Sequence, residues 1–163
     1  MVVLVRVDDR LIHGQVVEGW LRVLQPHRVL VVSDQAAGDS LQVSLMRLAL
    51  PEGVALDVLS IEEASRVLRE NKWGAERVII LSPGISEIRA LVESGVSFSE
   101  INLGGLHFLP GRRMFLPHLG WTEEERVDLN FLLGRSIKIE TRAVPTDPVQ
   151  LLEELLGSAA SLL

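Results

Sequence analysis

The chain has 163 residues, of which 47% are hydrophobic and 23% charged, and its formal net charge is −6. This balance is typical of a compact globular protein and excludes a disordered or fibrous chain, and the length fits one domain spanning residues 1–163. There is no cysteine, which excludes disulfides, thiolate chemistry, cysteine-ligated zinc and iron–sulfur clusters.

The sequence has neither a targeting pattern nor a membrane-spanning pattern. The apolar residues 1–5 are followed at once by Arg6, Asp8 and Asp9, too early for the apolar core of a signal peptide. No later apolar run approaches the roughly 18 residues of a membrane span. There is also no block of lysines or arginines of the kind that nucleic acid requires. We therefore expect a soluble, cytoplasmic protein whose partners are proteins or small molecules, and no nucleic-acid binding.

Short segments rich in Val, Ile and Leu recur along the chain and predict six strands, at residues 2–7, 28–33, 54–59, 77–82, 100–103 and 136–142. Several are apolar on successive residues, as is typical of parallel strands that are covered on both faces. The segments between them show helical spacing of apolar residues. The alternation predicts an α/β fold, a doubly wound and mainly parallel sheet with helices on both faces, with ligands approaching the carboxyl ends of the strands.

Local signals place three helix starts and one long loop. The Ser/Thr-x-x-Glu spacing of a capping box predicts helices that begin near residues 61 and 123: Ser60 with Glu63, and Thr122 with Glu125. Asp147 followed by Pro148 predicts a further helix that begins near 148. Residues 104–120 form the one long stretch without a regular pattern. A loop of this length in a compact domain is more often functional than accidental.

The turn after the first predicted strand, DDRLIHGQ at residues 8–15, carries the chemistry. It lacks the G-x-G-x-x-G and G-x-x-x-x-G-K-[ST] patterns, so a nucleotide is disfavoured here. Neutral imidazole at a helix start is a nucleophile, and the unpaired N–H groups of the helix favour an attached phosphoryl group. His13 is therefore the candidate nucleophile, with Gly14 and Gln15 as candidate phosphate-binding positions. Arg10 is placed to neutralise charge on the transferring oxygens.

Other interpretations of these residues stay open. A lone histidine near a strand end is more often a surface residue, and Asp8 and Asp9 either orient Arg10 or the His13 ring, or cap the loop. Asp9 is the candidate orienting group. A metal site from Asp8, Asp9 and His13 matches no specific ligand spacing, so we expect no metal and no cofactor. His107 and His118 flank the irregular stretch and could assist phosphate handling, but a surface hydrogen-bonding role is favoured for both. Simpler local, core or interface roles are favoured for the remaining histidine and the tryptophans: His27, Trp20, Trp73 and Trp121.

The segment RVDDRLIHGQV at residues 6–16 resembles the active-site signature of the IIB components of mannose/sorbose-family sugar phosphotransferase systems (PTS). The resemblance extends to VVSD at 31–34, NLGG at 102–105 and TDP at 146–148, and thus covers nearly the whole chain. It implies that His13 carries the phosphoryl group and that Arg10 stabilises its charge. It also implies that the loop after Gly105 is part of a partner-docking surface, for which the candidate residues are Phe108, Arg112 and Arg113.

The resemblance further implies the partners and the reaction. A IIA-type phosphohistidine protein would donate the phosphoryl group, and membrane IIC and IID components would bind the sugar that receives it, so this chain is not expected to bind sugar directly. Two features depart from the family pattern. Gln42 stands where family members tend to carry a basic residue, and residues 108–117 (FLPGRRMFLP) are more apolar than usual.

These departures motivate an alternative function. In it the chain is a regulatory phosphoprotein whose His13 state changes its binding to another protein, without delivery of phosphate to sugar. A third hypothesis, a hydrolase or metal enzyme that uses Asp8, Asp9 and His13, would require turnover without any partner.

Overall fold

The computed structural model describes residues 1–158 and contains a sheet of six strands, all parallel to their neighbours. Its order is β3 (Ala55–Leu59), β2 (Arg28–Val32), β4 (Val78–Ser82), β1 (Val2–Asp8), β5 (Glu100–Gly105) and β8 (Lys138–Glu140). This arrangement confirms the predicted α/β fold and all six predicted strands. The last strand is shorter than the segment 136–142 from which it was predicted.

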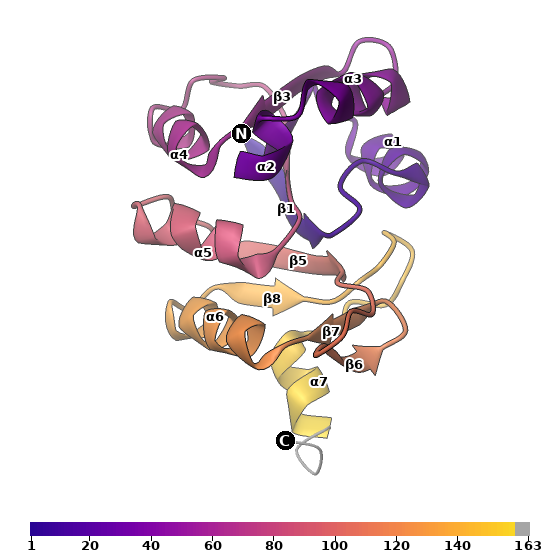
Figure 1. The fold of residues 1–163 in the computed structure, drawn as a ribbon, viewed down its shortest axis with the longest axis vertical. Coiled ribbons are helices and arrows are strands. Elements are labelled where there is room, and N and C mark those ends of the chain that lie inside the picture. Colours follow the sequence, from indigo (N-terminus) through magenta and orange to yellow (C-terminus); the bar gives the residue numbers. More distant parts are fainter. Residues whose placement is uncertain (159–163) are drawn as a thin grey trace.

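Helices cover both faces of the sheet (Figure 1). One face packs against α4 (Ile61–Arg69), α5 (Ile85–Glu93), α6 (Glu123–Gly134) and α7 (Leu152–Ser158). The other packs against the π-helical segment η1 (Gln15–Leu21), its continuation α1 (Arg22–Leu24), α2 (Asp34–Ala37) and α3 (Ser40–Ala49). Within residues 1–158, none of these helices is long and apolar enough to cross a membrane.

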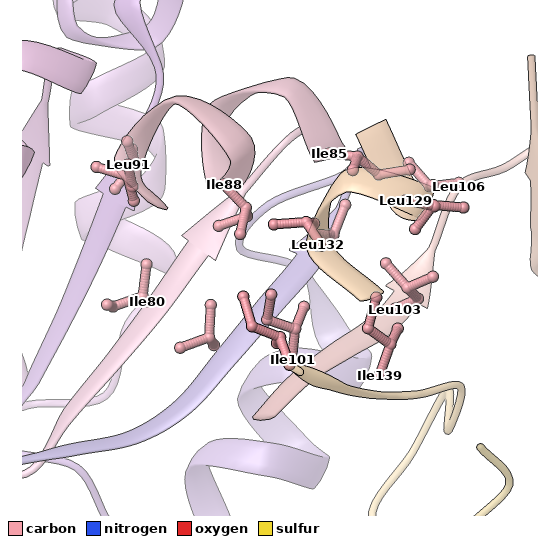
Figure 2. Close-up of a cluster of buried hydrophobic side chains, with 14 of the residues drawn as sticks. Ile80, Ile85, Ile88, Leu91, Ile101, Leu103, Leu106, Leu129, Leu132 and Ile139 are labelled. Carbon is pink, nitrogen blue, oxygen red and sulfur yellow. The ribbon is translucent and has the colours of Figure 1, made fainter. Parts of the chain in front are cut away.

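The two covered faces explain why the strands are apolar on successive residues. In β2, Leu30 and Val32 belong to the core under α4 and α5, whereas Val29 and Val31 belong to the core under η1 and α3. Figure 2 shows the first core, where Ile80, Ile101, Leu103 and Ile139 of the strands lie near apolar side chains of α5 and α6. Alternate residues of a strand point to opposite faces, so both sets are buried.

Two of the three predicted helix starts are confirmed. Ser60 and Thr122 cap α4 and α6, each in a capping box with the glutamate three residues later. The start near 148 is wrong, because the next helix begins at Leu152. The Asp147 carboxylate instead accepts hydrogen bonds from the N–H groups of Ala143 and Val144, so it closes a loop and does not cap a helix.

The stretch 104–120 is also more regular than predicted. It contains an antiparallel hairpin of β6 (Arg113–Leu116) and β7 (Leu119–Trp121). Phe115 stacks on Trp121 with ring centroids 4.0 Å apart. A Cβ at Gly120 would lie 2.5 Å from the carbonyl oxygen of Arg113, so the close approach of the two strands requires glycine there. Residues 106–112 form the remaining irregular part, directly after β5.

The ends of β1 and β5 define the edge where a ligand would approach. These strands are neighbours, and the N–H of Asp9 donates to the carbonyl of Gly105 across their ends. After β1 the chain crosses the η1 face towards β2, whereas after β5 it continues through the hairpin and α6 to β8, in the opposite direction. Such a switch point at the carboxyl ends of parallel strands is where doubly wound folds place their sites.

Candidate functional site

The turn that follows β1 brings its polar residues back over the strand end. The N–H of Leu11 donates to the carbonyl of Asp8 at 2.9 Å, and Leu11 adopts the left-handed backbone conformation with φ of 55°. The carbonyl of His13 then accepts from the N–H of Val17, so His13 lies directly before the first helical turn. The sequence prediction of a histidine at the entrance of a helix is confirmed.

His13 and Asp8 form a close pair. The Nε2 atom of His13 lies 2.9 Å from Oδ2 of Asp8. The Asp8 side chain is fully buried, whereas the His13 side chain is 16% exposed. The pair therefore links the interior of the sheet to a ring that solvent or a partner can reach.

The buried carboxylate of Asp8 is held in its ionised form. Burial by itself would raise its pKa, but the hydrogen bond with His13 and the positive charge of Arg6 outweigh this and lower the pKa to about 2. Arg6 donates to Oδ2 of Asp8 from Nη2 at 2.8 Å and from Nε at 3.2 Å. The guanidinium is itself fully buried, so the two charges compensate each other inside the protein.

Arg6 is in turn fixed by polar groups of the neighbouring strands. Its Nη1 donates to Oδ1 of Asn102 at 2.6 Å, and Asn102 donates to Oε1 of Glu140 at 2.8 Å. These residues occupy matched positions in β1, β5 and β8. A Cβ at Gly104 would lie 1.8 Å from Cζ of Arg6, so only glycine leaves room for the guanidinium. Two residues of the NLGG segment thus hold Arg6 beneath the site: Asn102 accepts its hydrogen bond, and Gly104 leaves room for its guanidinium.

The buried ion pair determines which nitrogen of His13 keeps its lone pair. An ionised carboxylate only accepts hydrogen bonds, so the proton between Asp8 and His13 belongs to Nε2. The neutral ring then carries its lone pair on Nδ1, for which residues 1–158 supply no hydrogen-bond donor. The arrangement presents Nδ1 as a nucleophile.

The other residues selected from the motif line the same turn. Arg10 donates from Nη2 to Oε1 of Gln15 at 2.9 Å, its Nε lies 3.7 Å from Oδ1 of Asp8, and its side chain is 43% exposed. Gly14 and Gln15 are exposed at the start of η1, where the first N–H groups of a helix have no partner within the helix. Arg10 and these N–H groups therefore lie at the same helix entrance as His13.

Asp9 does not have the position that the sequence suggested. Within residues 1–158 it makes no hydrogen bond with His13, whose carboxylate partner is Asp8. Its Oδ1 lies 2.7 Å from Nδ1 of His107, and its Oδ2 accepts from the backbone N–H of His107 at 2.7 Å. Asp9 thus fixes the loop after β5 and not the ring of His13.

The three candidate docking residues differ in exposure. Phe108 is 72% exposed, and Arg113 is exposed with its guanidinium 5.3 Å from the ring of Phe115. Arg112 is buried, so its assignment to a docking surface is wrong. It donates to Glu125 of α6 and to the carbonyl of His107, and it holds the loop against the body of the protein.

The sequence analysis missed the roles of Arg6 and Asn102 and the contact between His107 and Asp9. The signal for Arg6 and Asn102 was present, because each interrupts an otherwise apolar strand, and buried polar residues require partners. His107 had no such signal, since its place beside Asp9 depends on the pairing of β1 with β5.

The carboxylates at this edge also bear on metal binding. Asp8, Asp9 and His107 each offer one ligand atom within 4.8 Å of the others. Both carboxylates already have cationic or N–H partners, however: Asp8 binds Arg6, and Asp9 binds Arg112 and the N–H of His107. A divalent cation would have to displace these groups, so the residues present do not fit a metal centre well.

Comparisons with known proteins agree with the geometry. The chain matches the family described as "PTS system sorbose subfamily IIB component" over residues 2–163. It is 34% identical over 154 residues to the "PTS system mannose-specific EIIAB component" of Escherichia coli (strain K12), covering 94% of this chain but 48% of that protein. The chain thus spans about half the length of this relative. It is 30% identical to the "PTS system fructose-specific EIIB component" of Bacillus subtilis (strain 168), covering 90% of each chain.

A solved structure is similar over nearly the full length. The IIBSor domain of the sorbose permease from Klebsiella pneumoniae superimposes with a TM-score of 0.90 at 27% identity, covering 97% of each chain. This structure shares the fold described above. The chain therefore belongs to the family of PTS sorbose-subfamily IIB components.

Proposed function

We propose that this chain is a phosphocarrier that accepts a phosphoryl group on Nδ1 of His13 and passes it on. The observation that carries the proposal is the 2.9 Å contact between Nε2 of His13 and the buried, ionised carboxylate of Asp8. This contact reserves Nδ1 for bonding to phosphorus. Membership of the IIB family supports the same chemistry.

The proposed step is an in-line displacement between two histidines. The N–P bond of the donor's phosphohistidine breaks as a bond forms between phosphorus and Nδ1 of His13, and the donor nitrogen keeps the electron pair. The His13 ring, which retains the proton on Nε2, becomes cationic, and Asp8 stabilises that charge. Because one phosphohistidine replaces another, the protein contributes positioning and charge stabilisation more than driving force.

Two groups at the helix entrance would stabilise the transferring oxygens. Arg10, which already lies over Asp8 and Gln15, would contact them with its guanidinium. The first N–H groups of η1, at Gly14 and Gln15, would favour the negative charge of the phosphoryl group. Both are exposed and can therefore reach a group that a partner delivers.

The partners that we propose are those of a sugar phosphotransferase system. A IIA-type phosphohistidine protein would be the donor in the cytoplasm, and membrane IIC and IID components would hold the sugar that is phosphorylated. Such a relay makes the chain a protein-Nπ-phosphohistidine–sugar phosphotransferase. Exposed Phe108 and Arg113 are the proposed docking residues on the loop side of His13.

A second candidate function is favoured by one observation. Phe108 and Leu109 are 72% and 52% exposed in the loop after β5, and such adjacent apolar side chains suit a protein surface as the final partner. In that case the phosphorylated chain would regulate a protein and deliver nothing to sugar. Phosphoryl acceptance on His13 is common to both candidates.

Labelling and onward transfer separate these functions. A phosphorylated IIA partner is expected to label the chain with an acid-labile, base-stable phosphoryl group, which His13→Ala abolishes while His27→Ala does not. Chase into sugar in membranes that contain IIC and IID supports the carrier, and a label that stays on the chain supports regulation. Replacement of Gln42 by Arg tests whether a cation at position 42 matters for onward transfer. A guanidinium that reaches the phosphoryl oxygens in the complex with the next acceptor would raise the rate of onward transfer and leave acceptance from IIA largely unchanged.

A further inference from the structure

A second imidazole lies on the other side of the carboxylate that holds His13. A Cβ placed at Gly105 would lie 2.9 Å from both Oδ1 of Asp8 and Cε1 of His107. Oδ2 of the same carboxylate contacts Nε2 of His13. Asp8 is thus flanked by two histidines, one from the turn after β1 and one from the loop after β5. Glycine at 105 is what allows the second ring to approach.

His107 is held as firmly as His13. Its Nδ1 lies 2.7 Å from Oδ1 of Asp9, and its carbonyl accepts from Nη1 of Arg112 at 2.7 Å. Arg112 is anchored in turn by Glu125 of α6. The His107 side chain is 35% exposed, and within residues 1–158 its Nε2 has no hydrogen-bond partner. Nε2 therefore has no structural hydrogen bond within the described residues. It lies accessible on a fixed ring at the edge of the site, where it can bind a ligand.

We propose that His107, in its protonated form, is a phosphoryl-binding residue that donates from Nε2 to the group carried by His13. This inference rests on the proposed function of His13 and adds a residue to it. The loop after β5 thereby serves the phosphoryl group from within this chain. In its protonated form His107 also supplies positive charge next to the phosphoryl group.

The charges around His107 make its protonation depend on the phosphoryl group. Asp9 binds Nδ1 and Asp8 lies beside the ring, while Arg112 touches the loop backbone and is paired with both Asp9 and Glu125. Asp9 accepts a hydrogen bond from the N–H at Nδ1, so the first proton of the ring is on Nδ1. Nε2 can therefore donate only when the ring binds a second proton from solvent. A phosphoryl dianion nearby favours that proton. Phosphorylation of His13 is therefore coupled to proton uptake at His107.

The direct test follows the His107 ring by NMR in the whole chain, before and after phosphorylation by the IIA partner. The Cε1–H signal of His107 should titrate at higher pH in the phosphorylated protein, while that of His27, at the opposite end of the sheet, stays unchanged. Since this measurement uses the natural sequence, it does not depend on a variant that folds. A His107 titration that is the same in both forms would overturn the proposal.

A kinetic test uses His107→Gln, with His118→Gln as the matched control from the same hairpin region. Phosphoryl acceptance by His107→Gln should be roughly tenfold slower than by wild type at pH 6. This loss is smaller than that expected for a fully enclosed donor, because the His107 ring is partly exposed. The difference should shrink towards pH 9, where the ring of the wild type is no longer doubly protonated. His118→Gln should match wild type. Normal labelling of His13 with equal rates for His107→Gln and wild type would reject only this inference, whereas absence of any label on wild-type His13 would reject the proposed function itself.

Discussion

Oδ2 of Asp8 lies 2.9 Å from Nε2 of His13 and 2.8 Å from Nη2 of Arg6, so one buried oxygen joins the exposed ring to a buried guanidinium. The protonation pattern of the ring is therefore set from inside the sheet. Arg6 keeps Asp8 ionised, Asp8 keeps the proton on Nε2, and Nδ1 is left to react. Each of these contacts can be tested by a separate substitution.

Replacement of Asp8 by Asn should impair both chemistry and stability. The amide no longer fixes the tautomer or stabilises the cationic ring, so phosphoryl acceptance should slow by about 10²-fold or more. Arg6 would be left buried without its counter-ion, which should lower the free energy of unfolding by about 3–5 kcal/mol. Acceptance rates and urea unfolding measure the two effects.

The control for this variant is Asp57→Asn, which removes a partly exposed partner of Arg28 far from the site. It should change the free energy of unfolding by about 1 kcal/mol or less and leave acceptance unchanged. If Asp8→Asn accepts phosphate as fast as wild type, Asp8 does not fix the tautomer of His13 that reacts.

The lowered pKa of Asp8 predicts a specific acid dependence of stability. A fall from 3.8 to about 2 corresponds to roughly 2 kcal/mol in favour of the folded state, fully present above the unfolded-state value. The contribution is lost as the pH falls from about 4 towards 2, because the unfolded chain binds the proton first. Unfolding free energies of wild type and Asp8→Asn measured over this range should converge. Parallel curves would contradict the assignment.

Gly104 should be intolerant of any side chain. In Gly104→Ala the new Cβ would lie 1.8 Å from Cζ of Arg6, so the guanidinium must move and its bonds to Asp8 and Asn102 must weaken. We expect a loss of about 3 kcal/mol or more in the free energy of unfolding. Gly134→Ala, whose Cβ would meet nothing within 4 Å at the end of α6, should be neutral or slightly stabilising. Equal thermal stability of the two variants would show that Arg6 is not confined as described.

Arg10 should matter for chemistry and little for the fold. Its guanidinium is 43% exposed and contacts Gln15 and, more distantly, Asp8, so Arg10→Ala should cost about 1 kcal/mol or less of stability. Loss of a donor at developing charge should slow acceptance by about 10²-fold. Quenched time courses of phosphoryl acceptance measure the rate, and binding of the IIA partner is measured separately. Together they show whether Arg10 acts on the chemical step or on partner binding. An unchanged rate would mean that the helix entrance alone stabilises the oxygens.

The sheet and the position of His13 at a helix entrance could be predicted from sequence because both depend on local patterns. Apolar runs such as that of β2 and the capping boxes at Ser60 and Thr122 specify their elements without reference to distant residues. The hairpin at β6 and β7 escaped prediction because close packing at Gly120 stabilises it, and this is a tertiary effect.

The different partners of Asp8 and Asp9 could not be predicted from the sequence for a related reason. Adjacent carboxylates in one motif look equivalent, and only the register of β1 against β5 assigns one to His13 and the other to His107. The burial of Arg112 likewise follows from its contact with Glu125 of α6, which no local pattern reveals.

The most direct test of the proposed role of His13 is to determine which of its nitrogens carries phosphorus. Protein labelled with ¹⁵N in its histidines and phosphorylated by a IIA partner would be examined by ¹⁵N NMR with detection of the coupling to ³¹P. We expect one phosphorylated ring, His13, with phosphorus on Nδ1 and a proton on Nε2 facing Asp8. Phosphorus on Nε2 of His13, or on any other histidine, would contradict the proposed role.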